Sequence, residues 1–275
     1  MTKRIGWVKS LIMPATPAWP PKSAPRLFVT AALTADVVVS VEGPQAHYLA
    51  KVMRVSPGDI VILCDNLIGE WAARVISAGK RDVLLMPETL LRPREEVPDF
   101  TLCVALIKKP NFDLILEKAT ELGVRRIEPV ITRRCVADKL NPLRAAAIVT
   151  EAAEQCARTA LPELCAPVKL EALLRDWASG RVLFFADENG GEPAAAAFVA
   201  NPGPAALLIG PEGGFDEVER ALVRSLPQAR PISLGPRILR AETAAIAATA
   251  LWMAVSGDWK NLTGAEGHKT LPREK

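Results

Sequence analysis

The chain has 275 residues, of which 49% are apolar and 24% charged, and its net charge is +3. This apolar fraction is large enough to build a core, which excludes a chain that is disordered throughout. Five cysteines, no two closer than nine positions, exclude a disulfide scaffold. Residues 1–25 carry four basic and no acidic side chains, so the remainder is almost neutral. Bulk charge therefore does not indicate a nucleic-acid partner.

The first 25 residues are rich in proline, and Lys9 interrupts the apolar run at residues 5–8 before the core of a signal peptide could form. We expect a disordered leader here rather than a secretory signal. The longest strongly apolar stretch, residues 244–255, has 12 residues, whereas a membrane-spanning helix needs about 18 or more. We therefore expect a cytoplasmic protein with reduced cysteines and no membrane partner.

Residues 26–92 contain short β-branched runs separated by turn signals, which predict a small β-barrel domain. The runs lie at residues 37–39, 60–63, 73–76 and 83–86, and a helical stretch at residues 45–52 interrupts them. Trp71 is expected in the core of this domain. Residues 93–99 are charged and flanked by prolines, which predicts a linker between domains.

Strand and helix patterns alternate over residues 100–257, which predicts an α/β domain with a mainly parallel sheet. Strands are expected at residues 101–107, 126–131, 182–186, 205–209 and 232–234. Helices are expected at residues 112–122, 141–159, 216–225 and 242–255, with Asn111 and Asn141 as N-caps and a capping box formed by Asp216 and Glu219. Residues 258–275 are expected to form a flexible tail.

Two glycine-containing loops follow predicted strands, at residues 207–215 and 233–244. Loops at the carboxyl ends of parallel strands are where α/β sheets bind ligands. Neither loop has the Gly-x-Gly-x-x-Gly spacing of a dinucleotide fold or the Gly-Lys-Ser/Thr ending of a phosphate loop. An adenosine-type ligand held by main-chain groups fits better than a pyrophosphate, although either loop alone could be an ordinary tight turn.

Taken together, these two loops resemble the cofactor loops of the SPOUT methyltransferases. Four further stretches narrow the resemblance to the RsmE family: residues 26–29, 47–54, 117–124 and 151–158. The resemblance implies a SPOUT-type trefoil-knotted parallel-sheet domain with an N-terminal PUA-like β-barrel that binds RNA. It also implies S-adenosylmethionine-dependent methylation of N3 of a uridine in 16S ribosomal RNA of the small ribosomal subunit, by a homodimer.

Two other functions remain open at this stage. The chain could be a non-catalytic RNA-binding or ribosome-assembly protein, or a SPOUT methyltransferase that acts on transfer RNA. Two intact cofactor loops speak against the first, and the resemblance of residues 26–54 and 117–124 speaks against the second.

The resemblance assigns cofactor binding to residues of the two loops: Leu208, Ile209, Gly210, Pro211, Glu212, Gly213, Gly214, Leu234, Gly235, Ile238, Leu239, Arg240, Glu242, Thr243 and Ala244. Methylation at N3 of uracil leaves negative charge on the base, which a guanidinium can stabilise. We therefore expect Arg240 to be the catalytic residue, with a plain ion pair to Glu242 as the alternative.

Contacts to RNA are expected from seven polar residues, each of which could also be ordinary solvated surface: Arg26, His47, Lys51, Arg54, Arg134, Gln155 and Arg158. His47, Lys51 and Arg54 would share one helical face, as would Gln155 and Arg158. No general base is assigned, because His268 lies in the tail and His47 in the N-terminal domain. The cysteines lack metal-ligand spacing, so no metal is expected, and Cys135 stands where the RsmE family more often has serine.

Overall fold

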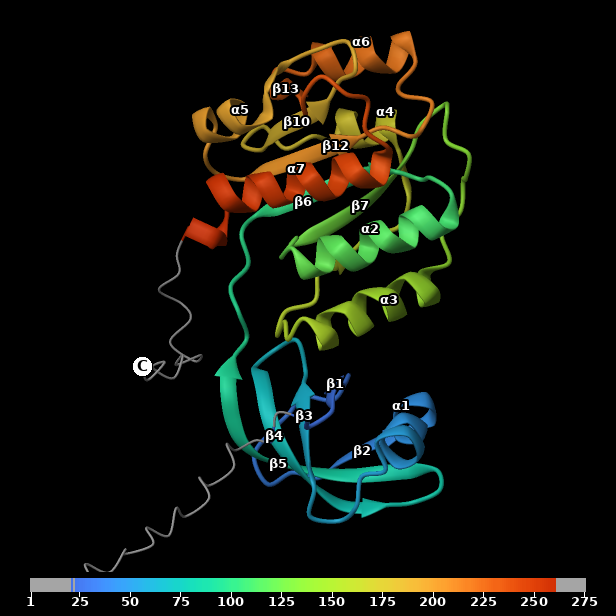
Figure 1. Cartoon of the computed structure of the whole chain (residues 1–275), viewed down its shortest axis with the longest axis vertical. Helices are drawn as coiled ribbons and strands as arrows, with labels where there is room; N and C mark the ends of the chain where they lie inside the picture. Colours follow the sequence, from blue (N-terminus) through green and yellow to red (C-terminus); the bar gives the residue numbers. More distant parts are fainter. Residues whose placement is uncertain (1–20, 22, 261–275) are drawn as a thin grey trace, which may run out of the picture. The chain divides into compact units, whose positions relative to one another are not determined.

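The computed structural model describes residue 21 and residues 23–260. Within this part, the chain divides into two compact units, drawn in Figure 1. The first comprises Met1–Leu63 and Trp71–Leu91, and the second comprises Cys64–Glu70 and Arg92–Lys275. Most of the expected leader and tail lies outside the described residues. The sequence did not indicate that Cys64–Glu70, which joins two strands of the first unit, groups with the second.

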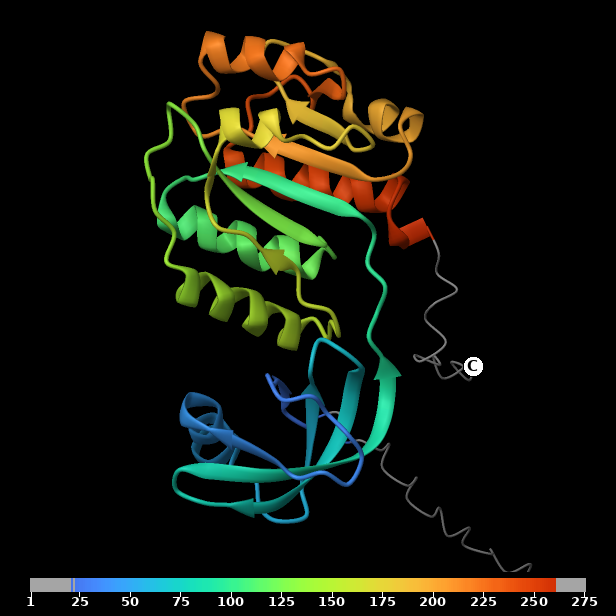
Figure 2. The same ribbon diagram turned by 180° about the vertical axis from the view of Figure 1, so that it is seen from behind.

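The first unit is built on a curled sheet of five strands, seen from behind in Figure 2. The strands follow the spatial order β1-β3-β4-β5-β2, so β1 and β2 form open edges and the sheet is a half-barrel. Trp71 lies in its core, as predicted, whereas Val37 and Val38 precede β2 and are exposed. The strands are β1 (Arg26–Phe28), β2 (Val39–Glu42), β3 (Ile60–Cys64), β4 (Gly69–Ala78) and β5 (Asp82–Pro93).

The helical stretch of this unit is a short α-helix that continues as a π-helix: α1 (Gly43–His47) and η1 (Tyr48–Met53). Arg54 follows it in the left-handed conformation, with φ 55°. A π-helix has more residues per turn than an α-helix, and Arg54 lies beyond its end. The prediction that His47, Lys51 and Arg54 share one face at α-helical spacing is therefore wrong, although all three are exposed.

The second unit is built on an eight-stranded sheet with the order β11-β13-β10-β12-β6-β7-β8, and β9 also pairs with β7. Neighbouring strands run parallel across the sheet, which confirms the predicted parallel α/β domain. The threading that would make a trefoil knot stays a prediction. The strands are β6 (Phe100–Ala105), β7 (Arg126–Ile131), β8 (Glu163–Leu164), β9 (Val168–Lys169), β10 (Val182–Ala186), β11 (Glu192–Pro193), β12 (Ala205–Ile209) and β13 (Ala229–Ser233).

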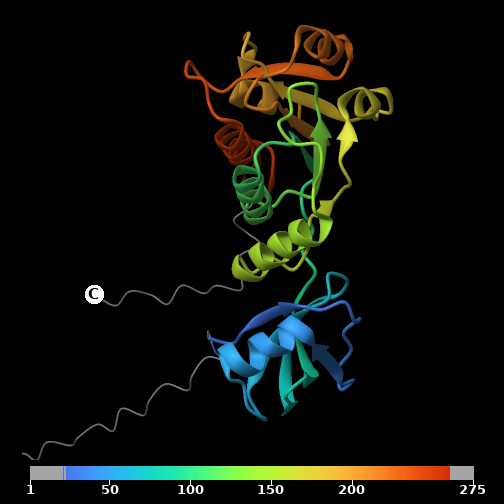
Figure 3. The same ribbon diagram turned by 90° about the vertical axis from the view of Figure 1, so that its right-hand side faces the viewer.

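Helices cover both faces of this sheet, and Figure 3 shows α2 and α7 together on one of them. One apolar core holds residues from α2, α3, α5 and α7 together with Leu207 and Ile209 of β12. The core on the opposite face holds residues from α4 and α6 together with Leu208. The helices are α2 (Lys109–Glu121), α3 (Pro142–Gln155), α4 (Leu170–Arg175), α5 (Ala194–Ala200), α6 (Glu217–Ser225) and α7 (Ala241–Val255), followed by the 3₁₀ turn η2 (Asp258–Lys260).

Two helix boundaries differ from the prediction. The helix α2 begins at Lys109 rather than after Asn111, because Pro110 fits the first helical turn and pre-sets its backbone. The helix α3 ends at Gln155 rather than near residue 159, because Ala157 takes a left-handed conformation with φ 60°. None of the helices in the described ranges has the length and apolar character needed to cross a membrane.

The capping box predicted at the start of α6 is confirmed. The Asp216 carboxylate accepts a hydrogen bond from Glu219 N at 2.7 Å, and Glu219 Oε2 accepts one from Asp216 N at 3.2 Å. Glu219 Oε1 also accepts from Arg133 N at 2.7 Å, and Arg133 Nη1 donates to Asp216 Oδ2 at 3.0 Å. The box therefore fixes the segment after β7 as well as the helix.

The backbone donor of Glu219, helped by the Arg133 guanidinium, lowers the pKa of Asp216 below its ordinary value. We expect Asp216→Ala to lower the melting temperature by about 2–4 °C at pH 7, because the cap and the ion pair are both lost. A group with a lowered pKa stabilises the fold above its unfolded pKa, and this contribution disappears as the pH falls through the folded value.

The difference between wild type and Asp216→Ala should thus shrink as the pH falls below about 4, measured by thermal unfolding at several pH values. Asp216→Asn is the matched control, since it keeps an acceptor for Glu219 N but loses the charge. A difference that does not depend on pH would contradict this account of Asp216.

Candidate functional site

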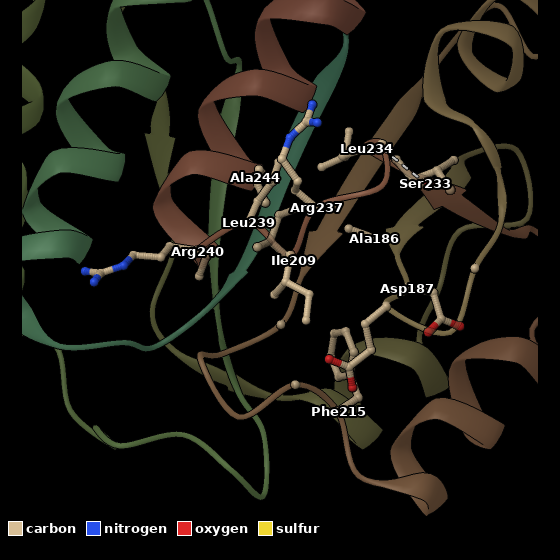
Figure 4. Close-up of a pocket in the computed structure, with 18 of the residues that line it drawn as sticks. Ala186, Asp187, Ile209, Phe215, Ser233, Leu234, Arg237, Leu239, Arg240 and Ala244 are labelled. Carbon is tan, nitrogen blue, oxygen red and sulfur yellow. Dashed lines mark hydrogen bonds between the residues drawn. The ribbon is translucent and has the colours of Figure 1, made fainter.

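A pocket of about 350 Å³ opens where β10, β12 and β13 end, shown in Figure 4. These three strands are neighbours in the parallel sheet, so the loops that follow them leave the same edge. Ligands of open α/β sheets bind at this edge, and the volume lies within the usual range for small-molecule sites. Three loops form the walls, at residues 186–190, 209–215 and 232–241, and Ala244 of α7 adds to them.

Most of the residues expected to bind a cofactor line this pocket: Ile209, Gly210, Pro211, Glu212, Gly214, Leu234, Gly235, Ile238, Leu239, Arg240 and Ala244. Four of the expected residues do not line it: Leu208, Gly213, Glu242 and Thr243. Leu208 is buried in the core between the sheet and the helices α4 and α6. Glu242 and Thr243 belong to the first turn of α7. The cofactor-binding role of the lining residues stays a prediction.

The sequence analysis missed one wall of the pocket, the loop after β10. Its lining residues are Ala186, Asp187, Glu188 and Gly190. The sequence does carry a turn signal there, in the run Asp-Glu-Asn-Gly-Gly directly after a predicted strand. The turn signal alone does not show that this loop belongs to the pocket. That follows only from the strand order, in which β10 lies between β12 and β13.

Glycines let the pocket loops pack closely. A Cβ atom on Gly210 would lie 3.0 Å from the ring of Phe215, which is itself buried. Gly214 and Gly235 have φ angles of 65° and 105°, a conformation that side chains other than glycine rarely adopt. Main-chain groups of both loops can therefore come close to a ligand.

Acidic groups gather at one end of the pocket. The Asp187 carboxylate is fully buried and accepts hydrogen bonds from Arg224 Nη2 at 2.6 Å and from Asn189 N at 3.0 Å. Its Oδ1 atom also lies 3.2 Å from Arg220 Nε. Glu188, the next residue, accepts from Arg220 Nη2 at 2.8 Å. This end of the pocket is therefore a network of carboxylates and guanidinium groups.

Basic groups lie elsewhere on the pocket wall. Arg240, the residue before α7, is exposed, and Figure 4 shows its side chain extending away from Asp187. Within the described part of the chain its guanidinium has no ion pair or hydrogen bond, so the expected alternative of a pair with Glu242 is absent. Glu242 is 9% exposed, and its Oε2 atom has no hydrogen-bond partner among the described residues. Arg240 is thus available to a ligand.

The residues expected to contact RNA are placed in different surroundings. Arg134 Nη1 donates to Gly213 O at 2.8 Å, which attaches it to a pocket loop. Gln155 is exposed at the end of α3, and Arg26 is partly buried in β1.

The prediction for Arg158 is wrong. It is 5% exposed, and its Nη1 atom donates to Thr120 O at 2.7 Å and to Val124 O at 3.2 Å. This burial also lowers its pKa. Because α3 ends before it, Arg158 cannot share a helical face with Gln155. Arg158 ties the loop after α3 to the end of α2, and it is not accessible to RNA.

Three of the cysteines, Cys135, Cys165 and Cys103, lie in surroundings that suit a structural role. Cys135 Sγ accepts from Thr132 N at 3.2 Å and lies 3.3 Å from Thr132 Oγ1, so it fills a turn position. Burial, with the nearby Glu128 carboxylate, raises the pKa of Cys165 to about 12, and burial also raises the pKa of Cys103. Over the described residues, no three side chains of His, Cys, Asp or Glu are grouped to hold a metal ion.

Comparison with known proteins identifies the family and agrees with the fold. Residues 94–253 match the RNA methyltransferase domain family, and residues 41–86 match the RNA methyltransferase PUA domain family. The chain is 30% identical to ribosomal RNA small subunit methyltransferase E of Rickettsia conorii, over 82% of this chain and 93% of the relative.

Two similar solved structures contain S-adenosylmethionine. One is ribosomal RNA small subunit methyltransferase E of Neisseria gonorrhoeae, with 26% identity, a TM-score of 0.79, and coverage of 86% of this chain and 99% of that chain. The other is a putative methyltransferase of Legionella pneumophila, with 29% identity, a TM-score of 0.76, and the same two coverages.

The fold and the pocket thus define a SPOUT-type RNA methyltransferase domain that is preceded by a PUA domain. Within this class, the chain belongs to the ribosomal RNA small subunit methyltransferase E family, the RsmE family that the sequence analysis indicated.

The contact between Gly210 and Phe215 gives a test of how tightly the pocket is packed. We expect Gly210→Ala to lower the free energy of unfolding by ~1–3 kcal/mol, because the added methyl group would press on a buried ring. Gly213→Ala is the matched control in the same loop, since its Cβ would be 3.5 Å from Arg134, an ordinary contact. Denaturant unfolding measures both variants, and equal effects would contradict the tight packing at Gly210.

Proposed function

We propose that this chain methylates N3 of a uridine in 16S ribosomal RNA of the small ribosomal subunit, with S-adenosylmethionine as the methyl donor, in the cytoplasm. The observation that carries the proposal is the pocket formed by the three loops after β10, β12 and β13. Family membership supports it, as do the two similar structures, which contain S-adenosylmethionine. The position N3 rests on the resemblance to the RsmE family.

The pocket residues fit this cofactor. The main chain of residues 209–214 and 234–239 can hydrogen-bond an adenine edge, and the side chains of Ile209, Leu239 and Ala244 give it an apolar surface. The glycines allow the close approach that main-chain binding requires. Bound S-adenosylmethionine would supply an electrophilic methyl group attached to a sulfonium centre.

Arg240 is the residue that we assign to the chemistry on the RNA side. Loss of the imide proton from uracil N3 spreads negative charge over O2 and O4 of the base. An exposed guanidinium that has no partner in the described structure can donate a charge-assisted hydrogen bond to one of these oxygens and leave N3 open to the methyl group. Arg240 stands directly before α7 and lines the pocket, which supports this assignment.

RNA contacts are assigned to exposed polar residues of both units. In the first unit these are the exposed residues His47, Lys51 and Arg54. Arg26 of the same unit is also assigned to RNA, although it is partly buried. In the second unit they are Arg134 and Gln155. Four of these six groups are cationic, so we expect about four phosphate contacts at most and a moderate dependence of binding on salt.

Mass-spectrometric mapping of ribosomal RNA tests the proposed function. The 16S RNA of cells that lack this chain should lose one N3-methyluridine, and small ribosomal subunits from those cells should regain it when incubated with the protein and S-adenosylmethionine. A methyl group that appears in transfer RNA instead would support the transfer-RNA alternative. Binding of the cofactor without methylation of any RNA would support the non-catalytic alternative.

We expect Arg240→Ala to lower the rate of methyl transfer by about 100-fold or more, because preorganised donors of this kind contribute at least that factor. Affinity for the cofactor should stay within a few-fold, measured by calorimetric titration. Arg230→Ala is the control, because Arg230 is exposed on β13, does not line the pocket and should leave the rate unchanged. Unchanged turnover in Arg240→Ala would contradict the assignment.

We further propose that the protein is a homodimer whose partner covers the rim of the pocket. Ile238 lies between Arg237 and Arg240 on this rim, and 93% of it is exposed. The homodimer rests on the resemblance to the RsmE family, and a side chain so exposed at the rim of the pocket is one that a partner chain could cover. Sedimentation should give twice the mass of one chain, and Ile238→Asp should shift the equilibrium toward monomer; a monomeric wild type would contradict the proposal.

A further inference from the structure

We propose that Glu188 is a specificity-determining residue that accepts hydrogen bonds from the ribose hydroxyls of the bound nucleoside, and that Arg220 is the residue that positions it. This inference rests on the proposed function, because it concerns the cofactor of the same pocket. Glu188 lies in the loop after β10, which is the wall that the sequence analysis did not find.

Arg220 holds the Glu188 carboxylate at the pocket. Its Nη2 atom donates to Glu188 Oε1 at 2.8 Å, while its other nitrogens face Glu217 Oε1 at 2.7 Å and Asp187 Oδ1 at 3.2 Å. The Arg220 side chain is only 8% exposed, although it also lines the pocket. A buried guanidinium fixed on three sides gives Glu188 a defined position.

The missing side chain of Gly214 makes room for this carboxylate. A Cβ atom on Gly214 would lie 2.8 Å from Glu188 Oε1, closer than such atoms are found in proteins. Glu188 therefore lies against the main chain of the loop after β12, one of the two loops that we assign to the adenine. A group that lies beside the adenine loops is near the ribose of a bound adenosine.

The two neighbouring carboxylates differ in what they can still bind. Both oxygens of Asp187 are used inside the protein, and its side chain is fully buried. The Glu188 side chain is 49% exposed, and within the described residues only Oε1 has a hydrogen-bond partner. Glu188 Oε2 is thus the acceptor that the acidic end of the pocket offers to a ligand.

The place of Glu188 beside the adenine loops favours one of two ligand groups for this acceptor. The ligand carries two candidates, the ribose hydroxyls and the ammonium group of the amino-acid tail. Arg220 occupies Glu188 Oε1 but is shared with Asp187 and Glu217, so it fixes Oε2 as an acceptor that faces the ligand without cancelling the charge of Glu188. Vicinal hydroxyls match such a group, and a carboxylate on a ribose hydroxyl is a common pairing in nucleotide sites.

Calorimetric titration with S-adenosylhomocysteine and its 2′-deoxy and 3′-deoxy analogues tests the assignment. In wild type, removal of at least one hydroxyl should weaken binding by about 10- to 100-fold, as expected for a hydrogen bond to a charged acceptor. Glu188→Ala should weaken binding of S-adenosylhomocysteine by a similar factor. In this variant the deoxy analogues should bind almost as well as the parent, because the two losses are not independent.

Glu217→Ala is the matched control. It also removes one carboxylate partner of Arg220, but Glu217 is 83% exposed, does not line the pocket and leaves two of the three contacts of Arg220 in place, so affinity should fall much less than in Glu188→Ala. Thermal unfolding of the two variants should agree within a few degrees, which separates loss of binding from loss of folding. An equal loss of affinity in both variants would overturn the ribose assignment in favour of a structural role for Arg220 and its partners.

Titration with 5′-methylthioadenosine, which keeps the ribose but lacks the amino-acid tail, separates the two ligand groups. The loss in Glu188→Ala should persist with this probe. A loss that disappears would place the ammonium group at Glu188 and overturn the proposal, as would deoxy penalties that are the same in wild type and in Glu188→Ala. Failure of wild type to bind S-adenosylhomocysteine would overturn the proposed function and this inference with it.

Discussion

The parallel pairing of β13, β10, β12 and β6 is the constraint on which the site depends. Parallel strands all end at the same edge, and the buried side chains on both faces leave no freedom to shift their register. The three loops that make the pocket come from segments far apart in sequence. They lie close together because the strands before them, β13, β10 and β12, are neighbours in the sheet. Side chains complete the pocket, but the order of the strands determines which side chains lie close to one another.

The charged groups at the pocket fall into two regions, and the proposed function uses each of them differently. Asp187 and Glu188 lie in the network with Arg220 and Arg224, and the side chain of Arg240 extends away from that network. A cofactor with neutral hydroxyls can use the first region, and a base that becomes negative can use the second. Among the described arginines that line the pocket, Arg220 is engaged in the network, whereas Arg240 has no partner and stays available to the RNA in the proposed function.

Local signals allowed parts of this structure to be predicted from sequence. The capping box of Asp216 and Glu219 and the two glycine loops depend on residues within a few positions of one another, and the structure places them as expected. The loop after β10 was missed because its importance depends on which strands are neighbours, which no local pattern encodes.

Other errors have local physical causes. Arg158 was assigned to an exposed face because nothing in the sequence indicates that Ala157 takes a left-handed conformation and ends the helix early. Alanine favours helices, so propensity alone extends the helix past this point. The prediction that Arg54 shares a helical face with His47 and Lys51 assumed 3.6 residues per turn. The π-helix before Arg54 has more residues per turn, so that spacing does not apply. Both errors concern helix ends, where backbone conformation matters more than composition.

The order of the strands also governs when the molecule can form during synthesis. The strand β6 (residues 100–105) pairs with β12 (residues 205–209), so a central strand must wait for about one hundred further residues before its second neighbour exists. The pocket is later still, because its last wall comes from residues 232–244. Contacts of this sequence separation slow folding. A nascent chain that has not yet emerged as far as α7 therefore has no complete pocket, and the cofactor can stabilise only a chain that is almost finished.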